Sequence, residues 1–170
     1  MPGAQDRWDL ARFVQAQQPH YADALAELRA GHKRTHWSWY VLPQLAGLGH
    51  SAMSQRYALS GLDEARAYLA HPLLGARLRE CVAALNAHAG RRADDVLGAV
   101  DALKLHSCLT LFLQAAPGSA PFQDALETFF GGAPDTATLR LLAAPATRWP
   151  ARSGLAAIVL QQSAAARTIT

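Results

Sequence analysis

The chain has 170 residues, a length typical of one domain, and 51% of the residues are hydrophobic while 17% are charged. This composition excludes an intrinsically disordered protein, because enough apolar surface is available to offset the entropy lost on folding. The net charge is +3, but 14 of the 16 basic residues are Arg, scattered in a way that resembles a coding bias. Since nucleic-acid binding usually requires a cluster of positive charge, we do not expect a nucleic-acid partner.

The residue types favour helices over strands. The chain contains 36 Ala and 25 Leu, but only 6 Val and 2 Ile. Ala and Leu are strong helix formers, whereas the β-branched residues that fill strands are scarce. We therefore predict an all-α fold, a compact irregular multi-helix domain without a sheet.

The first part of the chain predicts two helices. Asp9 is a candidate N-cap for a helix that runs from Leu10 to Gln17 and ends before Pro19. The second helix carries an apolar stripe from Tyr21 to Leu28. It should end at Gly31, because glycine readily adopts the left-handed conformation that closes helices.

The next segment, residues 32–49, is irregular and aromatic, with two Trp, one Tyr, one Pro and two Gly. It predicts a short helix or extended piece around 37–42, broken before Pro43 and followed by a glycine-containing loop. Ser51 is the expected N-cap of a helix over 52–59, and Leu62 begins another helix.

The sequence after Leu62 predicts further helices, which brings the total to about nine. Pro72 begins a longer helix that should end at Gly90, and residues 93–97 form a short one. A helix over about 100–115 is apolar nearly all round, so we expect it to be central and buried. Two more follow, one ending at Gly131 and one capped by Asp135 or Thr136.

We predict one domain over residues 1–144 and an appendage over residues 145–170, where the sequence becomes Ala-rich and poorly patterned. The first residues lack the features of a secretory signal, and the apolar run from Leu155 to Leu160 is too short to cross a membrane. These features predict a cytoplasmic protein that is not associated with a membrane.

Cys81 and Cys108 lie within apolar helical patterns and are expected to be buried reduced thiols. The His residues lack metal-ligand spacing, so we expect no metal and no cofactor.

Polar and aromatic side chains concentrate between Lys33 and Tyr57. Indole faces can stack on a planar ring, a Lys and the free amides at Ser51 can hold an anion, and an amide side chain can recognise a donor and acceptor edge. The segment therefore predicts a pocket for a phosphorylated or nucleotide-like small ligand. With two residues of the central helix added, the candidate ligand-binding residues are Lys33, His36, Trp37, Trp39, Gln44, Ser51, Ser54, Tyr57, Lys104 and Ser107.

Two alternatives stay open for the same residues. Trp37 and Trp39 can be core anchors of an irregular loop, and Asp101 and Lys104, three apart on a helix, can be a helix-stabilising ion pair. In that case the helices would offer a groove to a partner protein, and the chain would be an interaction module. No oligomeric state is predicted.

The residue pattern also resembles a bacterial family named domain of unknown function 1810, over residues 9–142. The resemblance rests on many positions in order, among them Tyr21, Glu27-Leu28, Gly31, Lys33, His36-Trp37, Trp39, Pro43-Gln44, Gly47-Leu48-Gly49, Ser51, Ser54, Tyr57, His71-Pro72, Asp101, Lys104-Leu105 and Ser107. It implies an all-helical, armadillo-like stack and no established activity. Some members carry the label calpastatin, an inhibitor class that is disordered and rich in Lys and Glu, unlike this chain with its 2 Lys.

Two further points follow from resemblance. Ser38 stands where the family usually has Met, and Cys108 where a second Ser is common. A fainter similarity, from Ala16 to Lys33, is to the NADAR enzymes, helical proteins thought to cleave N-glycosidic bonds. That similarity implies N-glycosidic hydrolysis, with Glu27 or Asp101 as the catalytic carboxylate that stabilises an oxocarbenium-like state.

Overall fold

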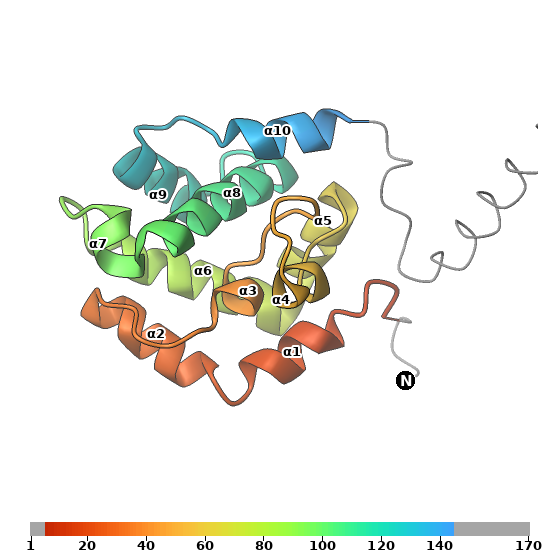
Figure 1. The fold of residues 1–170 in the computed structure, drawn as a ribbon, viewed down its shortest axis with the longest axis horizontal. Coiled ribbons are helices and arrows are strands. Elements are labelled where there is room, and N and C mark those ends of the chain that lie inside the picture. The colour runs from red at the N-terminus through yellow and green to blue at the C-terminus, as the bar shows by residue number, and fades with distance from the viewer. Residues whose placement is uncertain (1–5, 145–170) are drawn as a thin grey trace, which may run out of the picture.

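The computed structural model describes residues 6–144, and in this range the chain forms ten helices and no sheet, which confirms the predicted all-α class (Figure 1). The predicted appendage at 145–170 lies outside the described residues. The helices are α1 (Ala11–Gln17), α2 (Tyr21–Ala30), α3 (Ser38–Val41), α4 (Ala52–Arg56), α5 (Leu62–Ala70), α6 (Pro72–Asn86), α7 (Ala93–Leu97), α8 (Ala99–Ala115), α9 (Ala120–Phe130) and α10 (Thr136–Ala143).

The longest helix, α8, is the centre of the fold. It packs against α5, α7, α9 and α10, while α6 packs against α2, α5 and α9. Figure 1 shows α1 and α2 along one edge of the molecule and α9 and α10 along the opposite edge, with α6 and α8 between them. Leu105, Leu109 and Phe112 of α8 are fully buried, as the apolar pattern predicts. The first turns of α8 differ from the prediction, since Val100 and Leu103 are exposed.

Helix boundaries follow the sequence where a local signal sets them. Gly31 ends α2 with φ 73°, and Ser51 caps α4 by accepting a hydrogen bond from the amide of Ser54. Asp135 caps α10 in the same way, through the amide of Thr138. His71 precedes Pro72 and accepts hydrogen bonds from the first-turn amides of α6 through its ring nitrogen.

The predicted cap of the first helix is wrong. Asp9 adopts a left-handed backbone with φ 51° and does not cap α1. The carboxylate of Asp6 instead accepts hydrogen bonds from the amides of Leu10 and Ala11, both at 2.8 Å. A side chain three residues earlier thus satisfies the donors that Asp9 was expected to satisfy.

Two other helices end earlier than predicted. The helix α4 ends at Arg56 because Leu59 leaves the helical path and forms an isolated parallel bridge with Leu45. The bridge uses hydrogen bonds from the Leu59 amide to the Gln44 carbonyl, at 3.0 Å, and from the Ala46 amide to the Leu59 carbonyl, at 2.8 Å. The helix α6 ends at Asn86, and Gly90 lies in the turn that follows.

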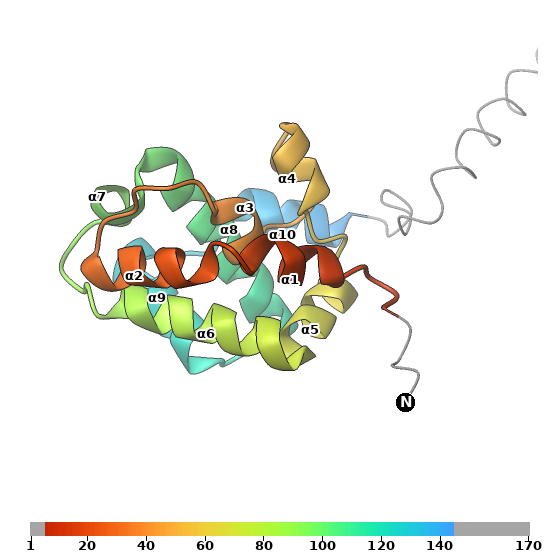
Figure 2. The ribbon, with the colours of Figure 1, turned by 90° about the horizontal axis from the view of Figure 1, so that it is seen from below.

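Arg12 joins three parts of the chain around α4. Its buried guanidinium donates to the carbonyls of Trp8, Asp9, Arg56 and Ala58 and to the carboxylate of Glu64. All five N–H groups therefore have partners, and the ion pair with Glu64, at 3.3 Å, is buried on both sides. These bonds fix the segment between α4 and α5, which Figure 2 shows beside the projecting helix α4.

Cys81 on α6 and Cys108 on α8 are buried and free, as predicted. None of the helices in residues 6–144 is long and apolar enough to cross a membrane.

Candidate functional site

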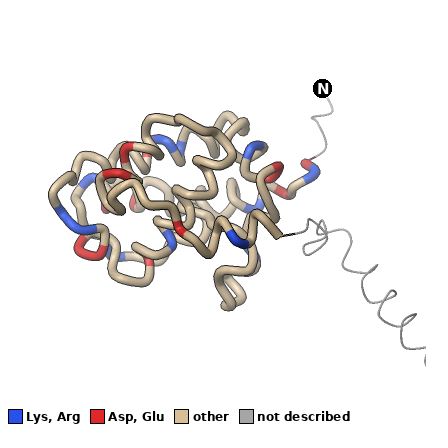
Figure 3. Tube along the Cα trace, turned by 90° about the horizontal axis from the view of Figure 1, so that it is seen from above, with Lys and Arg blue, Asp and Glu red and all other residues tan. Residues whose placement is uncertain are grey.

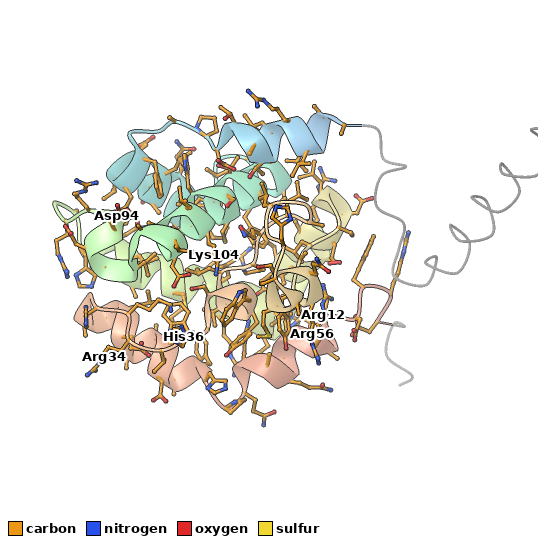
Figure 4. The ribbon with its side chains drawn as sticks, in the orientation of Figure 1. Arg12, Arg34, His36, Arg56, Asp94 and Lys104 are labelled. Atoms are coloured by element: carbon orange, nitrogen blue, oxygen red, sulfur yellow. The ribbon has the colours of Figure 1, made fainter. Side chains whose placement is uncertain are left out.

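A pocket of about 300 Å³ lies between the segment that follows α2 and the first turns of α8. Figure 4 labels His36 and Lys104, which come from these two sides, whereas Arg34 projects outward from the fold. The residues that line the pocket are Lys33, His36, Trp37, Ser38, Trp39, Val100, Asp101 and Lys104.

Two lysines share one carboxylate in this pocket. Lys33 Nζ lies 2.9 Å from Asp101 Oδ2, and Lys104 Nζ lies 3.3 Å from Asp101 Oδ1. The side chains are largely buried, with 6% of Lys33 and 17% of Lys104 and of Asp101 exposed. The predicted Asp101–Lys104 pair therefore forms, but Lys33 adds a second cation to it.

The carboxyl group of Asp101 is held in its ionised form. Burial by itself would raise the pKa of Asp101, because a charge loses hydration away from water. The hydrogen bond and the charge of Lys33, together with the charge of Lys104, outweigh that effect and lower the pKa of Asp101 below its usual value. The pocket thus contains two positive charges and one negative charge at neutral pH.

Each lysine also lies over an indole ring. Lys33 Nζ is 5.0 Å from the ring centroid of Trp37, and Lys104 Nζ is 4.8 Å from that of Trp39. These distances are within the range of cation–π attraction. The two indoles differ in access to solvent, since Trp37 is 1% exposed and Trp39 is half-buried. Trp37 is therefore a core residue, as one alternative predicted, while Trp39 presents part of its ring to the pocket.

Glu27 on α2 holds one wall of the pocket in place through hydrogen bonds. Its Oε1 accepts hydrogen bonds from the amides of Arg34 and Thr35, and its Oε2 accepts from the Thr35 hydroxyl and from Trp37 Nε1. Four donors occupy the lone pairs of this buried carboxylate, and Glu27 does not line the pocket. Its role in the structure is to hold residues 34–37 in place beside Lys33.

Ser38 is a lining residue that the sequence analysis missed. Its hydroxyl is buried and has no hydrogen-bond partner among residues 6–144. It nevertheless lies near enough to Asp101 to help lower the pKa of that carboxyl group. The signal available in the sequence was the position of Ser38 between Trp37 and Trp39, two aromatic residues already predicted to line the pocket.

Several hydrogen-bond donors in the pocket are not used by residues of the chain itself. Lys33 donates to the carbonyl of Thr35 and to Asp101, which leaves one of its three N–H groups. Lys104 pairs with Asp101, which leaves two. No other acceptor in the described part of the chain binds the remaining N–H groups of Lys33 and Lys104. Together with the Ser38 hydroxyl, these N–H groups can donate hydrogen bonds to the oxygens of an anion.

The predicted site residues do not all meet. Lys33, His36, Trp37, Trp39 and Lys104 line the pocket, whereas four other predicted residues do not and instead form two polar pairs, Gln44 with Ser107 and Ser51 with Ser54. The Ser107 hydroxyl donates to Gln44 Oε1 at 3.3 Å, and the Ser51 hydroxyl donates to Ser54 Oγ at 2.9 Å. Tyr57 is a core residue, with its ring centroid 5.3 Å from Tyr40 and 5.8 Å from Phe13.

No group of three or more His, Cys, Asp or Glu side chains within residues 6–144 is arranged to hold a metal ion. His106 on α8 contacts nearby residues: its ring stacks on that of Phe130, with the ring centroids 4.1 Å apart, and its Nε2 lies 2.7 Å from the Ala133 carbonyl.

Comparison with known proteins identifies relatives of the chain. Residues 7–142 match the model of the family described as "Protein of unknown function (DUF1810)". A solved crystal structure, of the conserved hypothetical protein Rv1873 from Mycobacterium tuberculosis, is 48% identical in sequence and superposes with a TM-score of 0.80. The similarity covers 82% of this chain and 100% of that chain. The search of curated proteins finds no match.

Proposed function

We propose that this chain, which belongs to the family described as Protein of unknown function (DUF1810), binds a small anionic ligand of the phosphorylated or nucleotide-like class. The ligand would occupy the pocket between residues 33–39 and α8. The observation that carries the proposal is the pair of buried lysines that share the single carboxylate of Asp101.

An anion complements this arrangement for two reasons. One positive charge in the pocket is not balanced by Asp101, and burying such a charge costs free energy unless it is paired. The first turn of α8 supports the same conclusion, because Gly98 provides no side-chain cap and two lining residues, Val100 and Asp101, belong to that turn. Amides at the start of a long helix favour anions.

The half-buried ring of Trp39 supplies the surface for a planar group of the ligand. Aromatic rings attract one another in stacked or edge-on arrangements, so a nucleobase or another flat ring can lie against the exposed part of the indole. The exposed ring of His36, with its centroid 6.5 Å from that of Trp39, borders the same surface.

A more specific proposal is that the site hydrolyses an N-glycosidic bond of the bound ligand. Asp101 is the candidate for the catalytic carboxylate. Asp101 lines the pocket and is held ionised, so it can stabilise a developing positive charge on a sugar. Glu27 is the poorer candidate, because four hydrogen bonds from the loop already occupy its oxygens.

Thermal unfolding of the full chain with added inorganic phosphate, AMP and adenosine tests this proposal. A ligand that binds only the folded state stabilises it, by about 2.7 kcal/mol at one hundred times its Kd. We expect AMP to raise the Tm of the wild type, and adenosine, which lacks the anion, to have little effect. Chromatography of the same AMP mixtures for free adenine tests whether the bound ligand is cleaved.

The matched variants are Lys104→Met and Arg66→Met. Lys104→Met removes a pocket cation and should weaken AMP binding about tenfold or more, the loss typical of a charged hydrogen-bond donor. Arg66→Met removes an exposed cation that pairs with Asp63 on α5, so AMP binding should not change. If neither phosphate nor AMP stabilises the wild type, the ligand proposal is wrong and the interaction-module alternative is favoured.

A further inference from the structure

We infer that the ligand of this pocket is amphipathic, with one anionic group held by Lys33 and Lys104 and an apolar body lying on Val100, which lines the pocket, and on the exposed Leu103 one turn further along α8. The inference rests on the proposed function and narrows its ligand class. It excludes small, fully polar anions as preferred ligands.

The exposed hydrophobic residues of the described chain are concentrated beside the pocket. Three large ones are exposed, namely Leu73 at 36%, Val100 at 68% and Leu103 at 69%. A single exposed Leu is common on protein surfaces and requires no explanation. Here the two most exposed of these three hydrophobic residues, Val100 and Leu103, belong to one helix, α8, and Val100 lines the charged pocket.

Helix geometry makes these two side chains one surface. Residues three apart on a helix are neighbours, so Val100 and Leu103 lie on the same face. Lys104 is four residues after Val100, and the aliphatic part of its side chain therefore extends this face toward the ammonium group. Since Trp39 and Val100 line the same pocket, apolar surface is present both beside the cation and outward from it.

The charges limit the anionic part of the ligand to one group. The three ionised side chains, Lys33, Lys104 and Asp101, sum to one positive charge. One anionic group can use the free N–H groups of both lysines, and a single phosphate monoester, with a charge of about −1.5 to −2 near pH 7, already offsets the whole of that positive charge. A second anionic group would either approach the carboxylate of Asp101 or extend over Val100 and Leu103, where it would lose hydration without a partner.

A pair of phosphate esters separates the apolar contribution from the anionic one. Methyl phosphate and phenyl phosphate present the same anion, but only the second carries a body large enough to cover Val100 and Leu103. Titration calorimetry of the full chain should show phenyl phosphate binding about tenfold more tightly, a difference equivalent to about 1.4 kcal/mol.

The Val100→Ser/Leu103→Ser double variant removes this exposed apolar surface. Both side chains are exposed, so the variant should remain folded, and the preference for phenyl phosphate should fall to about twofold or less. The matched control is Leu73→Ser on α6, which removes an exposed leucine away from the pocket and should keep the full preference.

The outcomes distinguish the inference from the proposed function. Equal affinities for the two esters in the wild type, or an unchanged preference in the double variant, would overturn the amphipathic ligand while leaving anion binding intact. If neither ester binds the wild type, this inference is wrong, and the proposed function is then decided by the results with inorganic phosphate and AMP.

Discussion

The carboxylate of Glu27 accepts hydrogen bonds from two amides, one hydroxyl and one indole N–H, all within residues 34–37. Burial by itself would raise the pKa of Glu27, but these bonds to the charged form outweigh burial and lower the pKa below its usual value. The same contacts position Lys33 and Trp37, so one residue on α2 organises a wall of the pocket that it does not line.

The lowered pKa predicts a pH dependence of stability. A carboxyl group with a lower pKa in the folded than in the unfolded state stabilises the fold above its unfolded pKa, about 4.3, and this stabilisation is lost as the pH falls through the folded value. We expect Glu27→Gln to lower the free energy of unfolding at neutral pH by about 1–3 kcal/mol, since Gln cannot accept all four bonds. The difference between wild type and variant should shrink in acid. Urea denaturation at neutral pH and at a pH below the unfolded value measures both effects.

The matched control for this prediction is Asp101→Asn. The pKa of Asp101 is also lowered, so Asp101 contributes to acid sensitivity with the same sign. The Asp101→Asn variant should still lose, as the pH falls, the part of the free energy of unfolding that Glu27 contributes. A Glu27→Gln protein that loses as much stability in acid as the wild type would contradict the assignment to Glu27.

At the scale of elements, local chemistry predicted most of the fold. The ends of α2, α7 and α10 follow from residues that act within one turn, such as Gly31 and Asp135. The predictions failed where distant groups decide: Asp6 replaces Asp9 as the cap of α1, and the bridge to Leu45 ends α4 early. Such contacts depend on how the elements pack against one another, and the spacing of residues along the chain gives no information about that packing.

The candidate site shows the same division. Lys33, His36 and Trp39 were grouped in the prediction because unusual residues were clustered in a short segment, and Lys104 because it is charged on an apolar helix; the structure places all four in the lining of one pocket. The same clustering also grouped Gln44, Ser51 and Ser54 with them, but these three residues do not line the pocket. Gln44 instead meets Ser107, one turn beyond Lys104 on α8, while Ser51 and Ser54 contact each other, and the sequence does not reveal which turn of a helix a loop will face.

The contact between α5 and α6 yields a prediction at this scale. A Cβ atom on Gly75 would lie 2.1 Å from the carbonyl oxygen of Leu69, a backbone atom that cannot move without shifting the end of α5. Although Ala is the better helix former, we expect Gly75→Ala to destabilise the protein by about 1–3 kcal/mol, the usual cost of overpacking. Chemical denaturation followed by circular dichroism measures this change.

Gly61 offers a matched control, since it precedes α5 with an extended backbone and a Cβ there would meet nothing within 4 Å. Gly61→Ala should therefore be close to neutral. Equal stabilities of the two alanine variants would show that α6 can move away from α5 without cost.

For the whole molecule, charge and core have different distributions. Figure 3 shows Lys and Arg interspersed with Asp and Glu along residues 6–144, and in this range the 13 basic residues are balanced by 13 acidic ones. The core, by contrast, is continuous: one cluster of buried hydrophobic residues extends from Leu10 to Leu126. The helices should therefore unfold together, as small single domains usually do.

The two thiols report directly on this cooperativity. Cys81 on α6 and Cys108 on α8 are both 0% exposed. Burial raises the pKa of Cys81 to about 12 and also raises the pKa of Cys108, which disfavours the reactive thiolate in the folded protein. We expect neither thiol to react rapidly with Ellman's reagent in native buffer at mildly alkaline pH, and both to react at once in concentrated guanidinium.

The slow native reaction should then be controlled by global opening. Cys81→Ser and Cys108→Ser proteins, each with one remaining thiol, should react at rates that increase with urea along the same slope once differences in stability are taken into account. That slope should match the denaturant dependence of global unfolding, because the surface exposed in the opening reaction sets it. A thiol whose rate does not respond to urea would instead open locally, and α6 and α8 would then not belong to one cooperative unit.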